Sequence, residues 1–217
     1  ADGAWGTELM KRGLQEGEVP EQLNIDRPET VREVAGDYLN AGSDIILTNS
    51  FTAGRCQLER HGLAEKVPEI NKAAAEIAVT AAKEFGARGG GAGPASGGAG
   101  GASSERAAGA GAGGAAGAAG AAGQSPRRFF SRPLVAGSMG PTGKLVTMKE
   151  IGTDELLEVF SEQAESLAAG GVDLLLIETM TDLEEMKIAV RAAAKTGLPV
   201  ISSMSYRSEE HTSELQS

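Results

Sequence analysis

The sequence predicts an α/β fold built on a parallel sheet, and three observations lead to this expectation. Short apolar runs rich in leucine or β-branched residues recur along the chain, and each ends in polar residues or glycine. Amphipathic stretches with helical spacing lie between these runs. The two kinds of segment alternate, which is the order expected when strands lie parallel and helices connect them.

Four segments are expected to be strands of this sheet. Continuous apolar runs indicate parallel strands that are covered on both faces. In chain order the segments are Ser43–Phe51 (SDIILTNSF), Arg132–Pro141 (RPLVAGSMGP), Val172–Met180 (VDLLLIETM) and Leu198–Tyr206 (LPVISSMSY). Asp2 would mark the tip of an earlier strand.

Four amphipathic helices are expected from apolar stripes at helical spacing. The stripes are Val31, Val34, Tyr38 and Leu39; Ile70, Ala74, Ile77, Ala81 and Phe85; Leu156, Phe160, Ala164 and Leu167; and Leu183, Met186, Val190 and Ala193. Asp26 is expected to cap the first helix and Thr153 the third, which Gly170–Gly171 would end. Asp182 and Glu185 form the pattern of a capping box at the start of the fourth helix.

Composition excludes several classes of protein. The chain has 217 residues and a net charge of −10, so neither a nucleic acid nor an anionic membrane is expected as a partner. No apolar run approaches the roughly 18 residues of a membrane helix, and no signal peptide is recognised. Cys56 is the single cysteine, so no intrachain disulfide can form, and a reducing, cytoplasmic location is expected.

Two segments are set apart from the expected domain, which spans residues 1–206. Residues 87–128 are dominated by Gly and Ala, with too little apolar side-chain mass to offset the entropy of ordering. We expect a disordered insertion there, or the product of misread GC-rich DNA. Residues 207–217 (RSEEHTSELQS) resemble the translation of a sequencing-library adapter, and we expect them to be a non-native tail.

Polar residues at the expected strand ends indicate a site at one edge of the sheet. Glu178 directly follows three leucines and an isoleucine, while Asn49 and Ser138 occupy the corresponding points of their own strands. Asp2 would end the earlier strand. Parallel α/β folds carry their active sites at the carboxyl ends of the strands. The alternative, that each residue is only a solvated strand end or a helix cap, stays open at this point.

Three other sequence patterns do not indicate a catalytic or binding site. The stretch GSMGPTGKL fails the phosphate-loop pattern, because Ser138 stands where glycine is required and Leu145 where Ser or Thr is required. Only one histidine, His61, lies outside the tail, so no Ser–His–Asp set can be proposed. Three further carboxylates fall at expected helix starts, where capping accounts for them. They are Glu8, Glu184 and Glu185.

Five phrases, in order, resemble the homocysteine-binding domain of the homocysteine S-methyltransferases, as in cobalamin-dependent methionine synthase and betaine–homocysteine methyltransferase. They are DGAWGTELMKRGL, AGSDIILTNSF, GLAEKVPEINKAA, VAGSMGPTGKL and GGVDLLLIETMTDLEE. The resemblance implies a (β/α)8 TIM barrel, of which this chain would supply strands one to five only. It also implies the substrate homocysteine, a zinc ion held by three cysteines, and methyl transfer to the zinc-activated thiolate to give methionine. The donor stays open among methylcobalamin with folate, betaine and S-methylmethionine.

The resemblance also implies roles for particular residues. Asp2 and Glu178 match the carboxylates that hold the substrate ammonium, and such a cation offsets the repulsion between two carboxylates. Asn49, Gly137 and Ser138 match positions near the substrate. Trp5 would either wall the pocket or pack beneath the first loop.

One departure from the family concerns the metal. The three zinc cysteines are absent, and Cys56 matches no ligand position. We therefore expect an inactive fragment of a methyltransferase. We also expect it to aggregate, because a barrel of only five strands leaves sheet edges and apolar surface uncovered. The alternatives are a fragment that binds amino acids without chemistry, or another TIM-barrel enzyme, a lyase, with Glu178 as general base.

Overall fold

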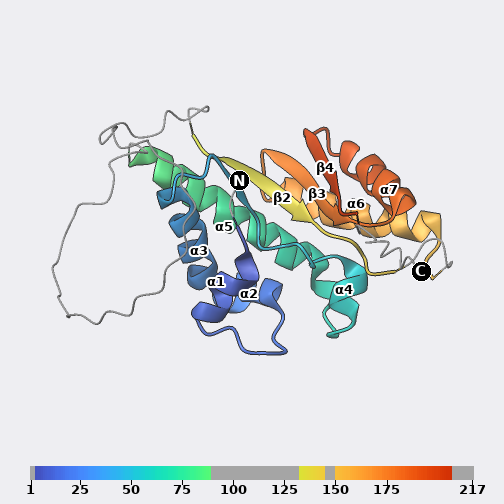
Figure 1. Cartoon of the computed structure of the whole chain (residues 1–217), viewed down its shortest axis with the longest axis horizontal. Coiled ribbons are helices and arrows are strands. Elements are labelled where there is room, and N and C mark those ends of the chain that lie inside the picture. The colour runs from blue at the N-terminus through green and yellow to red at the C-terminus, as the bar shows by residue number, and fades with distance from the viewer. Residues whose placement is uncertain (1–2, 89–131, 145–149, 207–217) are drawn as a thin grey trace, which may run out of the picture.

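The computed structural model describes residues 3–88, 132–144 and 150–206 (Figure 1). All four expected strands and all four expected amphipathic helices are present in these ranges. In chain order the elements are α1 (Trp5–Lys11), η1 (Pro20–Gln22), α2 (Leu23–Asp26), α3 (Pro28–Asn40), β1 (Ile45–Leu47), α4 (Arg55–Glu59), η2 (Ala64–Lys66), α5 (Val67–Ala87), β2 (Leu134–Met139), α6 (Thr153–Ala169), β3 (Leu174–Met180), α7 (Leu183–Ala194) and β4 (Val200–Met204).

The four strands form one parallel sheet in the order β1-β2-β3-β4. Strands that follow one another in sequence are therefore neighbours in space, and helices lie in the connections between them. Within the described residues β1 pairs only with β2 and β4 only with β3, so this sheet is not closed on itself. The expected tip of an earlier strand, at Asp2, lies outside the described residues.

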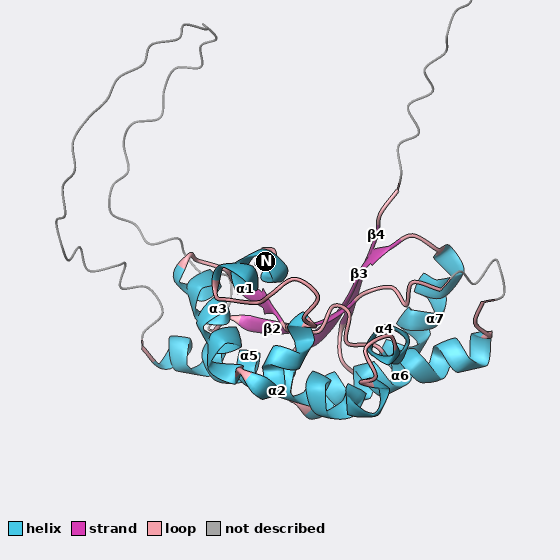
Figure 2. Cartoon of the chain, turned by 90° about the horizontal axis from the view of Figure 1, so that it is seen from below, coloured by secondary structure: helices cyan, strands magenta, loops and turns pink. Residues whose placement is uncertain are grey.

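The helices α3, α5, α6 and α7 cover one side of the sheet (Figure 2). The main core lies between them and the strands, with Phe160 and Leu167 of α6 packed in the same cluster as Leu175 and Ile177 of β3. A smaller cluster, with Leu9 and Val34 among its members, joins α1 to α3.

Two glycines allow close approach within this layer. A Cβ atom on Gly137 of β2 would lie 2.9 Å from Leu175 Cδ2 and 3.2 Å from Leu167 Cδ1. A Cβ atom on Gly170, which ends α6 as expected, would lie 2.3 Å from the Cβ of Ala75 on α5. Bulkier residues at these two positions would push the helices away from their neighbours.

The opposite face of the sheet is less covered. Side chains alternate along a strand, so the residues beside Gly137, Leu175 and Ile177 point away from the helices. Ser138 pairs in register with Leu176, which pairs with Ile201 of β4. Leu176 is partly buried and Ile201 is 48% exposed.

Helix starts differ from the sequence-based expectations in two places. The N-cap of α3 is Arg27, and Asp26 is instead the last residue of α2, because Pro28 takes the first helical position, where its fixed φ and missing N–H are tolerated. The N-cap of α6 is Gly152, so Thr153 is the first helical residue and does not cap the helix. Both predicted caps were wrong, each by one residue.

The set-apart segments are for the most part not described. α5 continues to Ala87 and Arg88 follows as its C-cap, so the first two residues of the 87–128 segment belong to the end of that helix. The remainder of this segment, and the predicted tail at 207–217, lie outside the described residues. None of the helices in the described ranges combines the length and the apolar character needed to cross a bilayer.

Candidate functional site

Two of the predicted site residues meet at the carboxyl ends of β2 and β3. Ser138 Oγ donates a hydrogen bond of 2.6 Å to Glu178 Oε1. The two strands are adjacent and parallel, so their carboxyl ends share one edge of the sheet. Ser138 is 1% exposed, whereas Glu178 is only partly buried. A carboxylate held by one hydroxyl, with part of its surface open, can accept further hydrogen bonds from a cationic ligand.

Irregular backbone follows the carboxylate immediately. Thr179 has φ 61°, a left-handed conformation that is strained for a β-branched residue, and the β3–β4 register shifts between Ile177 and Met180. An extra residue in one strand bends it and re-aims the neighbouring side chains. The backbone of β3 therefore deviates from regular strand geometry right next to Glu178.

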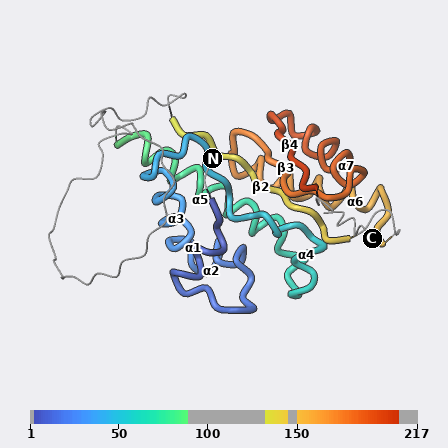
Figure 3. Tube along the Cα trace, viewed as in Figure 1, coloured from blue at the N-terminus to red at the C-terminus, as the bar shows by residue number. Residues whose placement is uncertain are grey.

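A second set of contacts fixes Ser138 from the side of β1. The Ser138 amide N–H donates to Thr48 Oγ1 at 3.0 Å, and Ser50 Oγ donates to the Ser138 carbonyl at 2.7 Å. The hydroxyls of Thr48 and Ser50 lie 2.6 Å apart. In the Cα trace of Figure 3, the chain after β1 runs beside the end of β2 toward α4, and Gly140 N donates to Phe51 O at 2.9 Å.

Asn49 is buried in a different set of contacts. Its Nδ2 donates to Pro20 O at 2.8 Å and to Asn24 Oδ1 at 3.0 Å, and Asn24 Nδ2 donates back to Asn49 O at 2.8 Å. Both N–H groups of the Asn49 amide thus bind the segment around α2. Gly137, the neighbour of Ser138, faces α6 and acts in packing. Asp2, the predicted partner of Glu178, lies outside the described residues.

Trp5 lies in α1 and packs on Tyr38 of α3, with ring centroids 6.3 Å apart. It also contacts both the main core and the smaller cluster around Leu9. These contacts favour the packing interpretation of Trp5 over a place in a pocket wall.

Glu185 was expected to complete a capping box, and this prediction was wrong. Asp182 does cap α7, because its Oδ1 accepts from the amides of Glu184 and Glu185. The Glu185 side chain is instead 2% exposed, and its Oε1 accepts from both Thr142 N and Thr142 Oγ1 at 2.7 Å. It thereby ties the loop after β2 to α7. Sequence analysis did not predict these contacts of Glu185, nor those of Thr48 and Ser50 with Ser138, because the partners lie far along the chain.

A zinc centre does not fit the described residues. They contain no group of three or more His, Cys, Asp or Glu side chains that could hold a metal ion. Cys56 is 7% exposed, and burial raises the pKa of its thiol, which disfavours the thiolate that binds zinc. We therefore derive no step through a metal from these residues.

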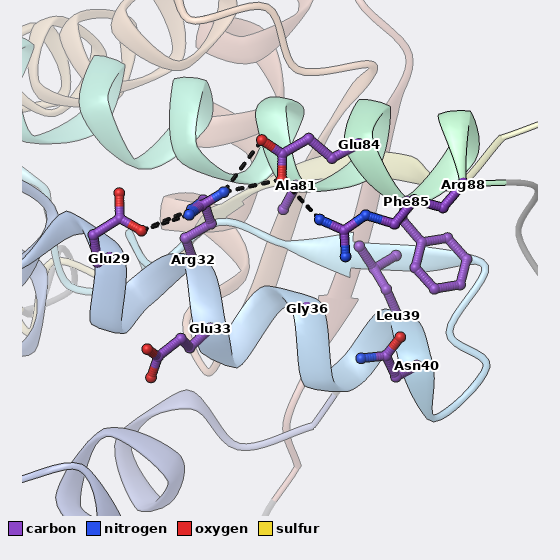
Figure 4. Close-up of a pocket in the computed structure, with 10 residues that line it drawn as sticks. All are labelled: Glu29, Arg32, Glu33, Gly36, Leu39, Asn40, Ala81, Glu84, Phe85 and Arg88. Atoms are coloured by element: carbon purple, nitrogen blue, oxygen red, sulfur yellow. Dashed lines mark hydrogen bonds and ion pairs between the residues drawn. The ribbon is translucent and has the colours of Figure 1, made fainter. Parts of the chain in front are cut away.

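One hollow of about 210 Å³ lies between α3 and α5 on the helical side of the molecule (Figure 4). Arg32 of α3 crosses it, with hydrogen bonds to Glu29 and to Glu84 of α5, and Arg88 pairs with Glu84 at 3.8 Å. None of its lining residues follows a strand, so it is separate from the pair of Ser138 and Glu178. The ion pair between Arg32 and Glu84 links α3 to α5 across this hollow.

Comparison with known proteins gives consistent results. The family model described as homocysteine S-methyltransferase matches residues 1–217. The methionine synthase of Mycobacterium tuberculosis (strain ATCC 25618 / H37Rv) is 28% identical over 208 residues, which cover 90% of this chain and 14% of that protein.

Solved structures with a similar fold include the homocysteine methyltransferase MmuM from Escherichia coli. Its metallated form has a TM-score of 0.66 at 21% identity, covering 94% of this chain and 61% of that one. Its apo form has a TM-score of 0.62 at 21% identity, covering 95% and 59%. At these identities the likeness shows the fold alone, and the chain spans less than two thirds of the length of each of these proteins.

Proposed function

The chain belongs to the homocysteine S-methyltransferase family, and from this premise we propose that its described residues hold the amino-acid end of homocysteine. In the parent protein the substrate would accept a methyl group on its thiolate to give methionine. The observation that carries the proposal is the contact between Ser138 and Glu178 at the carboxyl ends of β2 and β3. We further propose that the four parallel strands are an arc of a (β/α)8 barrel, and that residues 1–206 form the domain.

Glu178 is the proposed ligand of the substrate ammonium. Ser138 occupies one lone pair of Oε1 and holds the carboxylate in place, while the group stays partly exposed and keeps further lone pairs to offer to a ligand. A charge-assisted hydrogen bond between an ammonium and a carboxylate is about twice as strong as a neutral one. Asp2 is proposed as the second carboxylate. Asn49 and Gly137 are proposed to act indirectly, Asn49 by holding the chain after β1 and Gly137 by allowing β2 to pack closely.

The metal chemistry of the family is not assigned to these residues. The 217 residues contain one cysteine, so the three-cysteine zinc site that the family implies cannot be made from them. We therefore propose that this chain, by itself, binds homocysteine without converting it to methionine. Cobalamin with folate, betaine and S-methylmethionine remain candidate methyl donors of the parent protein.

Substitution of Glu178 tests the proposal. Glu178→Gln keeps the shape but removes the charge, and we expect the affinity for L-homocysteine to fall by about 10- to 100-fold, the loss of a hydrogen bond to a charged group. Calorimetric titration of the 217-residue chain at low protein concentration gives the dissociation constants.

Two controls accompany this measurement. Glu184→Gln changes an exposed carboxylate at the start of α7, paired with Lys187, and should leave the affinity unchanged. The analogue of homocysteine that lacks the amino group should bind wild type and Glu178→Gln equally weakly. Equal affinity of wild type and Glu178→Gln for homocysteine itself would contradict the proposed role.

A further inference from the structure

The backbone of Ser138 is held by two side chains in place of a neighbouring strand. In β2, alternate residues direct their backbone groups to the same side, and Ala136 O accepts from Thr48 N at 3.0 Å on the β1 side. Val135 O accepts from Asp173 N on the β3 side instead. Ser138, two residues after Ala136, therefore directs its N–H and C=O toward β1, which has already ended at Leu47.

Thr48 and Ser50 supply the missing partners. The chain turns after Thr48, with Ser50 N donating to Thr48 O at 2.9 Å, so that both hydroxyls approach Ser138. Thr48 Oγ1 accepts from Ser138 N, and Ser50 Oγ donates to Ser138 O. All three residues are at most 2% exposed, so water does not compete for these groups.

The hydrogen positions in this set follow from counting donors. Ser50 has one hydroxyl hydrogen, and it is donated to the Ser138 carbonyl. In the 2.6 Å contact between the two hydroxyls, Thr48 must therefore be the donor and Ser50 the acceptor. The result is a closed circuit from Ser138 N–H through Thr48 and Ser50 back to Ser138 C=O, which we call the hydroxyl circuit.

The hydroxyl circuit is anchored to the helical layer. Gln163 of α6 donates from Nε2 to Ser50 O at 2.9 Å and to Asn71 Oδ1 of α5 at 3.3 Å. Gln163 and Asn71 are at most 1% exposed. These contacts connect two helices to Ser138, whose side chain binds Glu178.

We propose that Thr48 and Ser50 are positioning residues of the substrate site, which set the place of the Ser138 hydroxyl and, through it, the Glu178 carboxylate. This inference rests on the proposed function of Glu178 and deepens it. Neither residue touches the substrate. Their effect on binding passes through Ser138 alone. A positioning role therefore predicts that their substitution matters only while the Ser138 hydroxyl is present, which a merely structural role does not predict.

Removal of the Thr48 hydroxyl is the central test, with L-homocysteine as the probe and the 217-residue chain as the protein. Thr48→Val should weaken binding by about fivefold or more, because Ser138 N–H loses its buried acceptor. Thr48→Ser restores the hydroxyl and should bind within about twofold of wild type. In a Ser138→Ala background the effect of Thr48→Val should largely disappear, since the hydroxyl it positions is gone.

Thr52→Val is the matched control on the same loop. Thr52 Oγ1 donates to Glu21 Oε1, away from the hydroxyl circuit, so this variant should lower the melting temperature and leave the affinity unchanged. Should circular dichroism show Thr48→Val to be unfolded, Ser50→Ala is measured in its place, with the same expected loss.

The outcomes separate the two proposals. If wild type binds homocysteine and Glu178→Gln does not, but Thr48→Val or Ser50→Ala binds like wild type, the positioning role is overturned and the proposed function stands. An equal loss with and without the Ser138 hydroxyl also overturns it. If wild type does not bind homocysteine, the proposed function fails and the inference with it.

Discussion

At the scale of single residues, the backbone of Thr179 is the clearest strained feature near the candidate site. Its φ of 61° is costly for a β-branched residue, and it lies one position after Glu178. Strained residues persist where the surrounding structure over-determines them, and they cluster at functional sites. The strain at Thr179 is consistent with a backbone bent to aim a carboxylate.

Thr179→Gly should relieve this strain. We expect the free energy of unfolding to rise by about 1 kcal/mol or less, because glycine adopts positive φ freely but gains entropy in the unfolded chain. Urea denaturation measures the change. Thr196→Gly is the control, since Thr196 has no positive φ and its Oγ1 donates to Ala193 O at 2.7 Å. It should destabilise, and a loss of stability in both variants would contradict the assignment of strain to Thr179.

At the scale of elements, the contact between α5 and α6 depends on Gly170. Gly170→Ala would place a Cβ atom 2.3 Å from Ala75 Cβ and 2.7 Å from Lys72 O. We expect it to lower the free energy of unfolding by about 2 kcal/mol or more, as overpacking does.

Gly36→Ala is the matched control for this clash. Gly36 lies inside α3, and a Cβ atom added to it would meet no atom within 4 Å, so alanine there should stabilise by about 0.5–1 kcal/mol through helix propensity. Both unfolding energies come from the same denaturant titrations. Similar effects of the two substitutions would show that the α5–α6 contact is looser than these distances indicate.

Asp173, directly before β3, binds Arg132 and the Val135 amide at the start of β2. The stability that these contacts contribute depends on pH. Burial alone raises the pKa of Asp173, but hydrogen bonds from Arg132 and from Val135 N–H outweigh it, so the pKa lies below its usual 3.8. Because the folded pKa is depressed, the stability that Asp173 contributes is present above about 3.8 and is lost as the pH falls through the folded value.

Asp173→Asn should therefore be less stable than wild type at neutral pH, and the difference should shrink below about pH 3.8. Thermal melting of wild type and Asp173→Asn from about pH 7 to about pH 2.5 measures the difference, because this range includes the pH at which carboxylates titrate. Arg132 is 46% exposed, so the difference is expected to be small and to decrease with salt. A gap that stays constant across this range would contradict the assignment.

The four strands and the four amphipathic helices were predictable from the sequence, whereas the partners of single side chains were not. Apolar periodicity located every expected strand and helix, because burial against a sheet imposes it on many residues at once. The rule that parallel strands end at a shared edge was enough to bring Ser138 and Glu178 together. Caps failed at Asp26 and Thr153, because a cap depends on the conformation of one residue.

The same limit explains the missed contacts. Glu185 fits a capping box in sequence, but its partner Thr142 lies 43 positions earlier in the chain. Thr48 and Ser50 act on Ser138, which is 90 and 88 positions away. Such contacts depend on where the strands end relative to one another, and a local sequence pattern does not predict the relative positions of strand ends.

At the scale of the whole molecule, association with other chains is most expected at the less covered face of the sheet and at β4, the edge strand of the described sheet. Ile201 of β4 is 48% exposed, on the face away from the helices, and β4 pairs only with β3 among the described strands. Exposed apolar side chains on an unpaired edge strand favour pairing with other chains. The expectation of an aggregation-prone chain stays a prediction, which the following substitution tests.

Ile201→Lys should therefore raise the concentration at which the chain remains monomeric, by about twofold or more, as charged residues on edge strands do. Static light scattering during concentration measures it. Leu183→Lys is the control, since Leu183 is similarly exposed at 53% but lies on α7. An equal gain from both variants would mean that net charge, and not the sheet face, limits solubility.

The position of Trp5 has a practical consequence for following the unfolding of this chain. It is the only tryptophan, and it packs on Tyr38 beside the small cluster that joins α1 to α3. Its fluorescence emission therefore reports on the packing of α1 against α3 and the main core, while far-ultraviolet circular dichroism reports on every helix and strand. Coincident curves from the two signals would identify a single cooperative unit, and a fluorescence change that precedes the dichroism change would reveal that α1 detaches first.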